Sequence, residues 1–288
     1  MEALLYKSFD NNKVECLVCN HYCLISSGNR GKCGVRENRN GILEVLNYNK
    51  TIASSIDPIE KKPIYHFLQH TKTYSFATVG CNMYCLWCQN HEISQVSKSK
   101  SEIRGKKVTP EHHIRNALLN NCPSISYTYS EPTIFFEYAF NTMKIARQEG
   151  IKNIWVSNGF MSKEVLDVII PYLDAINIDY KGTEEVYKKY CSGSEIRVLE
   201  NINRIKESGT HIEITILIIE GVNDSNAVLS LMAKNLENFA GLDIPLHLSR
   251  FFPSYRMKNR NVTSYETMYK AKRIFEEKGF TTIHLGNM

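Results

Sequence analysis

The sequence predicts an α/β protein, and three observations carry that prediction. The chain has 288 residues, of which 43% are hydrophobic and 23% charged, as in a typical globular domain. From about residue 73 onward, short β-rich runs alternate with amphipathic stretches at helical spacing. The earlier residues differ, because they hold four closely spaced cysteines, a glycine-rich patch and short strand-like runs. We therefore expect a cysteine-rich domain over residues 1–70 and a larger α/β domain over residues 71–288.

The alternation of strand-like and helical runs indicates a parallel sheet with right-handed crossovers. The expected strands are residues 74–79, 125–129, 154–157, 175–179, 212–219, 244–248 and 282–285. One helix is expected to begin after Thr109, with Pro110 at its first position, and another to end at Gly150. Residues 57–72 contain two X-Pro pairs and are interpreted as a connector. Six or seven strand-helix units favour a partial (β/α)6 barrel of the TIM type over a flat doubly wound sheet.

Polar and ionisable side chains occur at or just after the carboxyl ends of these expected strands. In parallel α/β folds those ends meet at one rim, which is where ligands bind. In chain order the rim residues are Cys81, Cys85, Cys88, Glu131, Asn158, Asp179, Lys181, His247, Arg250, Tyr255 and Arg256. We therefore expect the active site at this rim.

The first rim loop holds Cys81, Cys85 and Cys88 within eight residues. In a reducing compartment, grouped cysteines indicate metal ligands rather than disulfides. Three thiolates on a cluster of four irons and four sulfurs leave one iron without a protein ligand, and an open position allows chemistry. A small chelator with an amine and a carboxylate could occupy that position. A zinc site is the alternative, with His91 as the nearest fourth ligand.

A second group of four cysteines lies near the N-terminus. Its members are Cys16, Cys19, Cys23 and Cys33. Four thiolates close a tetrahedral shell, so a structural zinc site is one prediction. A second iron–sulfur cluster, which relays electrons or binds substrate, is the other. Cys122 and Cys191 stand apart and are expected to be buried thiols.

Charge and hydropathy exclude several kinds of partner. The net charge of +5 is mild, and the basic run from Lys98 to Lys107 lacks the interleaved aromatic residues of a nucleic-acid surface. The sequence has no apolar run of about 18 residues and no apolar signal core at its start. We expect a cytoplasmic protein that binds neither nucleic acid nor membrane.

The cysteine pattern of the first rim loop resembles that of the radical SAM superfamily. Cys81-x3-Cys85-x-Trp87-Cys88 directly follows the first expected barrel strand, as in that family. The resemblance implies a [4Fe-4S] cluster whose open iron is chelated by the amine and carboxylate of S-adenosylmethionine. It also implies reductive cleavage of that cofactor to methionine and a 5′-deoxyadenosyl radical, which abstracts hydrogen from a substrate.

Other rim residues match the family position by position. The resemblance implies that the cofactor is contacted by Trp87, Glu131, Asn158, Asp179, Lys181 and His247. Asp179 and Lys181 match the Asp-x-Lys element of glycyl-radical activases, and Glu131 matches the residue that receives the cofactor's amino group. Thr215 stands where those activases have an arginine, so we expect no matching contact there.

The chain further resembles an activase-like subfamily that is called AmmeMemoRadiSam. The shared motifs include DPIEKKPIYHF at 57–67, SYTYSEPTIFFEY at 126–138, NIDYKG at 177–182, HLSRFFPSYRM at 247–257, and the four N-terminal cysteines. Many members continue into a short cysteine-containing tail, whereas this sequence ends at Met288. On the loop after the sixth strand, Arg250, Tyr255 and Arg256 are candidates for holding the substrate.

Three functional hypotheses follow from these patterns. The first is a radical SAM enzyme that takes electrons from a flavodoxin or ferredoxin and acts on an unidentified small molecule, peptide or protein. The second is an activase that installs a glycyl radical on a partner enzyme. The third, from a different class, is a non-catalytic zinc-binding interaction module.

Overall fold

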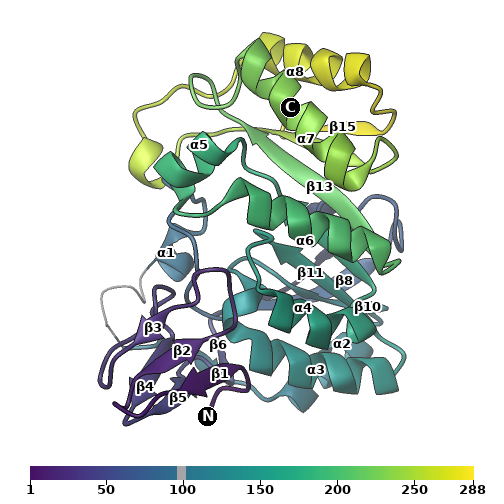
Figure 1. The fold of residues 1–288 in the computed structure, drawn as a ribbon. Helices are drawn as coiled ribbons and strands as arrows, with labels where there is room; N and C mark the ends of the chain where they lie inside the picture. Colours follow the sequence, from purple (N-terminus) through teal and green to yellow (C-terminus); the bar gives the residue numbers. More distant parts are fainter. Residues whose placement is uncertain (96–101) are drawn as a thin grey trace. The chain divides into compact units, whose positions relative to one another are not determined.

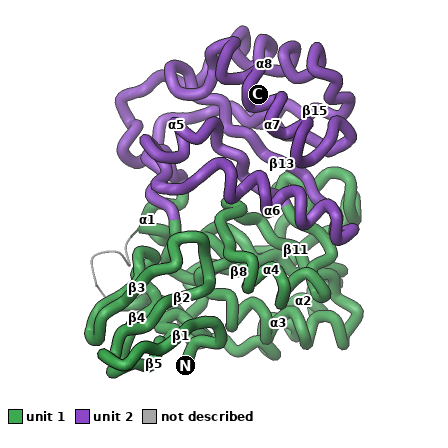
Figure 2. The backbone as a smooth tube through the Cα atoms, viewed as in Figure 1, with its two compact units in different colours: residues 1–82, 90–176 green, residues 83–89, 177–288 purple. Residues whose placement is uncertain are grey.

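The computed structural model describes residues 1–95 and 102–288, so Lys98 and Lys100 of the basic run lie outside the described residues. The chain folds into two compact units (Figure 2). Unit 1 contains residues 1–82 and 90–176, and unit 2 contains residues 83–89 and 177–288. The expected division at residue 70 stays a prediction, since residues on both sides of it belong to unit 1.

Unit 1 contains three parallel strands, each followed along the chain by a helix (Figure 1). The strands are β8 (Lys72–Ala77), β10 (Ser124–Tyr127) and β11 (Lys152–Ser157), and β10 lies between the other two. The helices are α2 (Pro110–Leu119), α3 (Phe136–Gln148) and α4 (Lys163–Ile169). The predicted start of α2 is confirmed, because the Thr109 side chain accepts a hydrogen bond from the His112 amide and Pro110 follows it. Gly150, with φ +73°, follows the end of α3.

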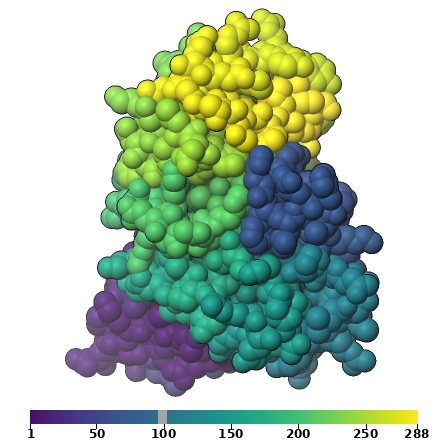
Figure 3. All heavy atoms as spheres, turned by 90° about the vertical axis from the view of Figure 1, so that its right-hand side faces the viewer, coloured from purple at the N-terminus to yellow at the C-terminus, as the bar shows by residue number. Residues whose placement is uncertain are grey.

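The N-terminal residues of unit 1 form small antiparallel sheets beside these helices. The strands are β1 (Tyr6–Ser8), β2 (Val14–Cys16), β3 (Leu24–Ile25), β4 (Arg36–Arg39), β5 (Ile42–Val45) and β6 (Lys50–Thr51). β6 pairs with β9 (Lys106–Lys107) from later in the same unit, which also contains the short helix α1 (His91–Ser94). Figure 3 shows the purple N-terminal residues in contact with teal residues of the same unit. The Arg36 guanidinium contributes to this packing, because it bonds both carboxylate oxygens of Glu137, at 2.9 and 2.5 Å, where both side chains are buried.

The expected connector begins inside a strand. β7 (Ala53–Pro58) pairs antiparallel with β8, with Ala53 opposite Ala77 and Pro58 opposite Lys72. The Asp57-Pro58 pair therefore closes a strand instead of opening a linker. Proline suits this position, because a strand's last residue at a sheet edge need not donate a ladder hydrogen bond.

Unit 2 contains three parallel strands and the last helices of the chain. The strands are β13 (His211–Ile218), β14 (Leu246–Arg250) and β15 (Ile283–Gly286), paired in that order. The helices are α5 (Glu184–Val186), α6 (Glu195–Glu207), α7 (Asn226–Ala240) and α8 (Tyr265–Lys278). β12 (Ala175–Asp179) contains the boundary between the units. Every strand expected after residue 73 is present within a few residues, so the α/β class with a parallel sheet is confirmed.

Candidate functional site

A glycine brings the N-terminal residues close to the start of the three-cysteine loop. Gly80 follows β8 with φ +108°, in the region that favours glycine. A Cβ atom at Gly80 would lie 2.8 Å from Cγ1 of Val35 and 3.2 Å from the carbonyl oxygen of Cys33. Any larger residue would push the N-terminal segment away from the loop. Cys81 therefore begins its loop directly beside the segment that holds the second cysteine group.

The Cys81 thiol lies beside two asparagine side chains of unit 1. The Asn158 amide nitrogen is 3.7 Å from Cys81 Sγ and 2.7 Å from the Asn82 side-chain oxygen. The buried Asn82 amide nitrogen has no hydrogen-bond partner among the described residues. Amide donors around sulfur are a means of tuning iron–sulfur clusters. The surroundings of Cys81 thus fit a cluster ligand, and the structure places the predicted residue Asn158 there.

Glu131 is buried at the end of the β10 loop and already accepts four hydrogen bonds. Its Oε1 accepts from the amide and the hydroxyl of Thr133, at 3.1 and 2.6 Å, and from the Ser157 hydroxyl at 2.7 Å. Its Oε2 accepts from the backbone amide of Asn158 at 2.8 Å. Burial raises the pKa of Glu131, and these hydrogen bonds oppose the rise. A carboxylate oxygen can accept a second donor, so Oε2 retains capacity for an ammonium group.

Cys85 and Cys88 belong to unit 2, where two segments hold their loop. The Leu86 amide donates to the Tyr190 carbonyl at 3.1 Å, and the Leu86 carbonyl accepts from the Arg256 amide at 3.0 Å. The Ser254 hydroxyl donates to the Cys88 carbonyl at 3.3 Å. Tyr190 lies in a π-helical turn, Tyr187–Cys191, a type of turn that is frequent at functional sites.

Trp87, between Cys85 and Cys88, is buried at 5% exposure. Its ring lies 6.1 Å from the ring of Tyr190. Trp87, a predicted cofactor contact, therefore has an aromatic neighbour in its own unit. All three loop cysteines are thiols, as are the other six cysteines of the chain.

Lys181 and Asp179 form an ion pair at the end of β12, with 3.3 Å between Nζ and Oδ2. Burial alone would lower the pKa of Lys181, but the Asp179 carboxylate and the neighbouring thiols of Cys85 and Cys191 raise it well above its ordinary value. Lys181 therefore keeps its charge near Cys85. This places a fixed cation where the resemblance predicts a cofactor contact.

His247 lies within β14 and contacts a carboxylate that the sequence reasoning missed. Its Nε2 is 2.6 Å from Oε2 of Glu213, which is fully buried, and Nε2 of His211 is 2.9 Å from the other oxygen. The His247 ring also stacks on His284, with centroids 5.1 Å apart. Thr215 lies opposite His247 in the strand pairing. Alternation along β13 places Glu213 and Thr215 on one face, which is the signal that would have found Glu213.

The predicted substrate residues brace the loop after β14. Arg250 Nε donates to the Thr263 carbonyl at 2.6 Å, and its guanidinium lies 4.1 Å from the ring centroid of Tyr265. Tyr255 has φ +48°, which is strained for a bulky residue. The Arg256 guanidinium lies 5.4 Å from the ring centroid of Tyr255, and the Arg256 side chain is exposed.

The four N-terminal cysteines share one neighbourhood in unit 1. Burial raises the pKa of Cys16 to about 12, which Arg36 opposes and Cys33 and Cys23 reinforce. The buried Nε of Arg36 has no hydrogen-bond partner in the described part of the chain, so a donor remains for a thiolate. The thiols fit the chemistry of a zinc or iron–sulfur site. However, no three Cys, His, Asp or Glu side chains within residues 1–95 and 102–288 already form a metal-binding group.

The segment that carries these cysteines docks on the loops that hold Cys81 and Asn158. His21 Nε2 is 2.8 Å from the Asn82 carbonyl oxygen, and Lys32 Nζ is 3.4 Å from His21 Nδ1. Because an ammonium group can only donate, Nδ1 accepts and Nε2 carries the proton that the carbonyl receives. Cys19 also forms a β-bridge with Met161. The segment with the N-terminal cysteines therefore lies beside the start of the three-cysteine loop, which their separation in sequence did not predict.

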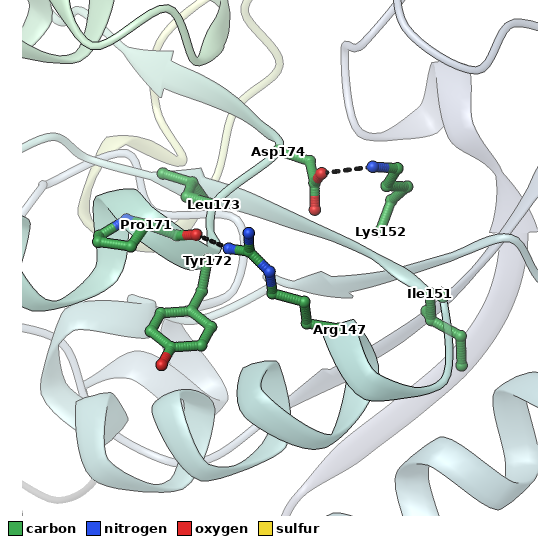
Figure 4. A pocket seen from close by; sticks show the side chains of 8 residues that line it. Arg147, Ile151, Lys152, Pro171, Tyr172, Leu173 and Asp174 are labelled. Atoms are coloured by element: carbon green, nitrogen blue, oxygen red, sulfur yellow. Dashed lines mark hydrogen bonds and ion pairs between the residues drawn. The ribbon is translucent and has the colours of Figure 1, made fainter.

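A cavity lies elsewhere in unit 1, at the amino-terminal ends of β11 and β12. Its volume is about 250 Å³, and Figure 4 shows Arg147, Lys152, Tyr172 and Asp174 among its lining residues. Lys152 pairs with Asp174 at 2.8 Å. The predicted site residues occupy the carboxyl ends of the strands, so this cavity is distinct from them.

No helix in the described part of the chain is long and apolar enough to span a membrane.

Comparison with known proteins gives a consistent family. Residues 76–231 match the model of the Radical SAM superfamily. An uncharacterized protein of Methanocaldococcus jannaschii is 40% identical over 287 residues, which cover 100% of this chain and 85% of that protein. The (2S)-3-sulfopropanediol dehydratase activating enzyme of Klebsiella oxytoca is 26% identical over 152 residues, 52% of this chain and 47% of that enzyme. The chain thus spans about half the length of that activating enzyme.

Solved structures share the fold. A domain of a pyruvate-formate lyase-activating enzyme from Bacteroides vulgatus matches with a TM-score of 0.50 and 22% identity, over 56% of this chain and 98% of that domain. A radical SAM methyltransferase from Sphaerobacter thermophilus matches with a TM-score of 0.56 and 15% identity, over 77% of this chain and 68% of that enzyme. These similarities confirm the predicted α/β partial (β/α)6 barrel with a cysteine-rich N-terminal region.

Proposed function

This chain belongs to the Radical SAM superfamily, whose members are enzymes that use an iron–sulfur cluster and S-adenosylmethionine, and from that membership we propose a specific site. Cys81, Cys85 and Cys88 hold the [4Fe-4S] cluster. When bound, the cluster supplies the electron that divides S-adenosylmethionine into methionine and a 5′-deoxyadenosyl radical, which takes hydrogen from a substrate. The observation that carries this proposal is the three-cysteine loop, which follows β8 directly and has no fourth cysteine of its own.

The chain's own residues orient the cofactor and the cluster. In unit 1, the side-chain amide nitrogen of Asn158 lies 3.7 Å from the Cys81 sulfur and helps to fix the orientation of that sulfur. Oε2 of Glu131 is the acceptor that we assign to the cofactor's amino group. In unit 2, the charged pair Asp179 and Lys181, the buried Trp87 and the Glu213-oriented His247 supply the remaining contacts.

The four N-terminal cysteines form a second metal centre in this proposal. Zinc is the first candidate and an auxiliary iron–sulfur cluster the second. Three of these four cysteines are buried, and the strands β1 to β5 of this segment are only two to four residues long. Metal binding would stabilise such a segment, since small metal-binding regions gain folding energy from their ligands. We also place the protein in the cytoplasm, where the nine thiols stay reduced.

Metal analysis and product analysis test the assignment together. Protein purified without oxygen is expected to contain iron and sulfide, and to release 5′-deoxyadenosine when a reductant and S-adenosylmethionine are added. Cys85→Ala should abolish that release, while Cys122→Ala, at a buried cysteine outside both groups, should retain it. A colourless protein with zinc at both groups would instead support the non-catalytic zinc module. Release of 5′-deoxyadenosine by Cys85→Ala would refute the ligand assignment.

Two similarities favour a second candidate function, that of an activase. The similar proteins include activating enzymes, so in this second candidate the substrate is a glycyl-radical partner protein. In the first candidate it is a small molecule or a peptide. Deuterium-labelled candidates separate these substrates, because abstracted deuterium appears in 5′-deoxyadenosine. Label that arrives only from a glycine Cα of a partner protein would establish the activase.

A further inference from the structure

The loop between Cys85 and Cys88 is clamped between two segments of unit 2. The Leu86 amide donates a hydrogen bond to the Tyr190 carbonyl at 3.1 Å, and the Leu86 carbonyl accepts one from the Arg256 amide at 3.0 Å. The backbone of Leu86 is therefore fixed by one hydrogen bond to each segment.

These segments carry an excess of positive charge. Residues 83–89, 184–191 and 250–265 contain six cations and two carboxylates, whereas the whole chain has a net charge of +5. The cations are Lys188, Lys189, Arg250, Arg256, Lys258 and Arg260, and the carboxylates are Glu184 and Glu185. Lys188 pairs with Glu184 at 3.3 Å, which leaves the excess on the other cations. The carboxylate of Glu220 accepts hydrogen bonds from the amide and the hydroxyl of Ser264, near the end of the 250–265 segment.

Aromatic rings connect this charged surface to the cysteines. Lys189 is exposed, and its Nζ lies 5.2 Å from the ring centroid of Tyr190. The Tyr190 ring lies 6.1 Å from that of Trp87, the residue next to Cys88. Two rings in contact therefore lead from a surface cation to the cysteine loop. Tyr84, on the same cysteine loop, is 36% exposed, so part of this loop lies at the surface.

We propose that this cationic rim, defined as Lys189, Arg256 and Lys258 on the two segments that bond the Leu86 backbone, is the docking surface for an acidic one-electron carrier protein. The inference rests on the proposed function, because the electron is destined for the cluster on the three-cysteine loop. One electron leaves the reduced carrier and one enters the cluster, and no bond or proton is exchanged. In this proposal Arg256, which the sequence analysis named as a candidate for holding the substrate, is assigned to the rim.

Two physical arguments select an acidic carrier. Complementary charge steers association and raises its rate, while adding little to the lifetime of the complex. Electron-transfer complexes are small and transient, so a short charged rim around the point of electron entry is sufficient. A carrier docked there would approach the cysteine loop at Leu86, where the peptide is held between the two segments.

Rapid mixing without oxygen tests the proposal on the cluster-loaded protein. The probe is a reduced two-iron ferredoxin with an acidic surface, and the readout is the bleaching of the cluster's visible absorbance. In the double variant Lys189→Glu/Lys258→Glu we expect the second-order rate to fall about tenfold or more at low salt. For the unmodified protein the rate should fall as salt increases. Photoreduced deazaflavin, a small reductant, should reduce both proteins at the same rate.

The matched control is Lys234→Glu/Arg273→Glu, on α7 and α8 of the same unit, where both side chains are exposed. It changes the net charge equally and should keep most of the ferredoxin rate. The proposal is overturned if the control slows as much as the rim variant, or if neither slows. It is also overturned if rim reversal impairs only turnover of a protein substrate. Failure of the unmodified protein to bind iron, or to be reduced by deazaflavin, would instead refute the proposed function.

Discussion

His113 on α2 gives a prediction that can be worked through quantitatively. Its imidazole is fully buried and stacks on Phe76, with ring centroids 3.9 Å apart. Nδ1 is 3.1 Å from the Tyr74 hydroxyl, and Nε2 is 2.7 Å from the Tyr138 hydroxyl. The Tyr138 hydroxyl donates to the Val108 carbonyl, so it accepts from Nε2, which also lies 3.1 Å from the Thr51 hydroxyl. The neutral ring satisfies these contacts. Burial lowers the pKa of this histidine to about 3.

The pKa of an unfolded histidine is about 6.5, so between about pH 6.5 and pH 3 the unfolded chain binds a proton that the folded protein refuses. Stability from this group is fully present above pH 6.5 and is lost as the pH falls through that window. Each pH unit in the window costs about 1.4 kcal/mol. Between pH 7 and pH 5 the loss attributable to His113 is therefore about 2 kcal/mol.

Denaturant unfolding of the metal-free protein at pH 7 and pH 5 measures this loss. The His113→Gln variant cannot titrate, so the pH-dependent decrease should be about 2 kcal/mol smaller than in the unmodified protein. His112→Gln, at the exposed neighbouring position, should retain the full decrease. The reasoning is refuted if His113→Gln and the unmodified protein lose the same free energy of unfolding between the two pH values.

Three further predictions follow from the interactions within the two units. Arg36→Met leaves Glu137 as an unpaired buried charge and should lower the free energy of unfolding by about 3–5 kcal/mol in denaturant titrations; a change below about 1 kcal/mol would contradict the pairing. His21→Phe removes the hydrogen bond to the Asn82 carbonyl, so amide exchange in residues 80–84 should accelerate and the cluster should lose iron faster on gel filtration. Lys181→Met should weaken S-adenosylmethionine binding by about 1.5–3 kcal/mol in calorimetry, and unchanged affinity would remove this residue from the site.

Local patterns predicted the fold well because strand and helix periodicities are properties of short segments. The expected bounds of β12 agree with the structure residue for residue, and the predicted start of α2 depends on two adjacent residues. β7 was missed because its pairing with β8 is an interaction between different segments, and its closing proline suggested a linker. An edge strand of this kind has no signal in its own sequence that separates it from extended loop.

The candidate site divides in the same way. The metal-binding role of the three-cysteine loop was predicted from cysteine spacing alone, because the spacing of ligands can be read directly from the sequence. The burial of Glu131 under four hydrogen bonds was not predicted, because Ser157 and Asn158 reach it from the next strand. Glu213 was missed because its role depends on His247, from a neighbouring strand.

By itself, the sequence determined the alternating α/β architecture and the three thiols that identify the superfamily, because both are encoded in residue order and spacing. Only the tertiary structure decided that the segment with the four N-terminal cysteines packs against Gly80 and Asn82, the residues on either side of Cys81, through Cys33 and His21. The same holds for the cations on both sides of Leu86. These juxtapositions join residues that are 47 or more positions apart, as the approach of Cys33 to Gly80 shows, and only the packing of the folded chain sets such distances.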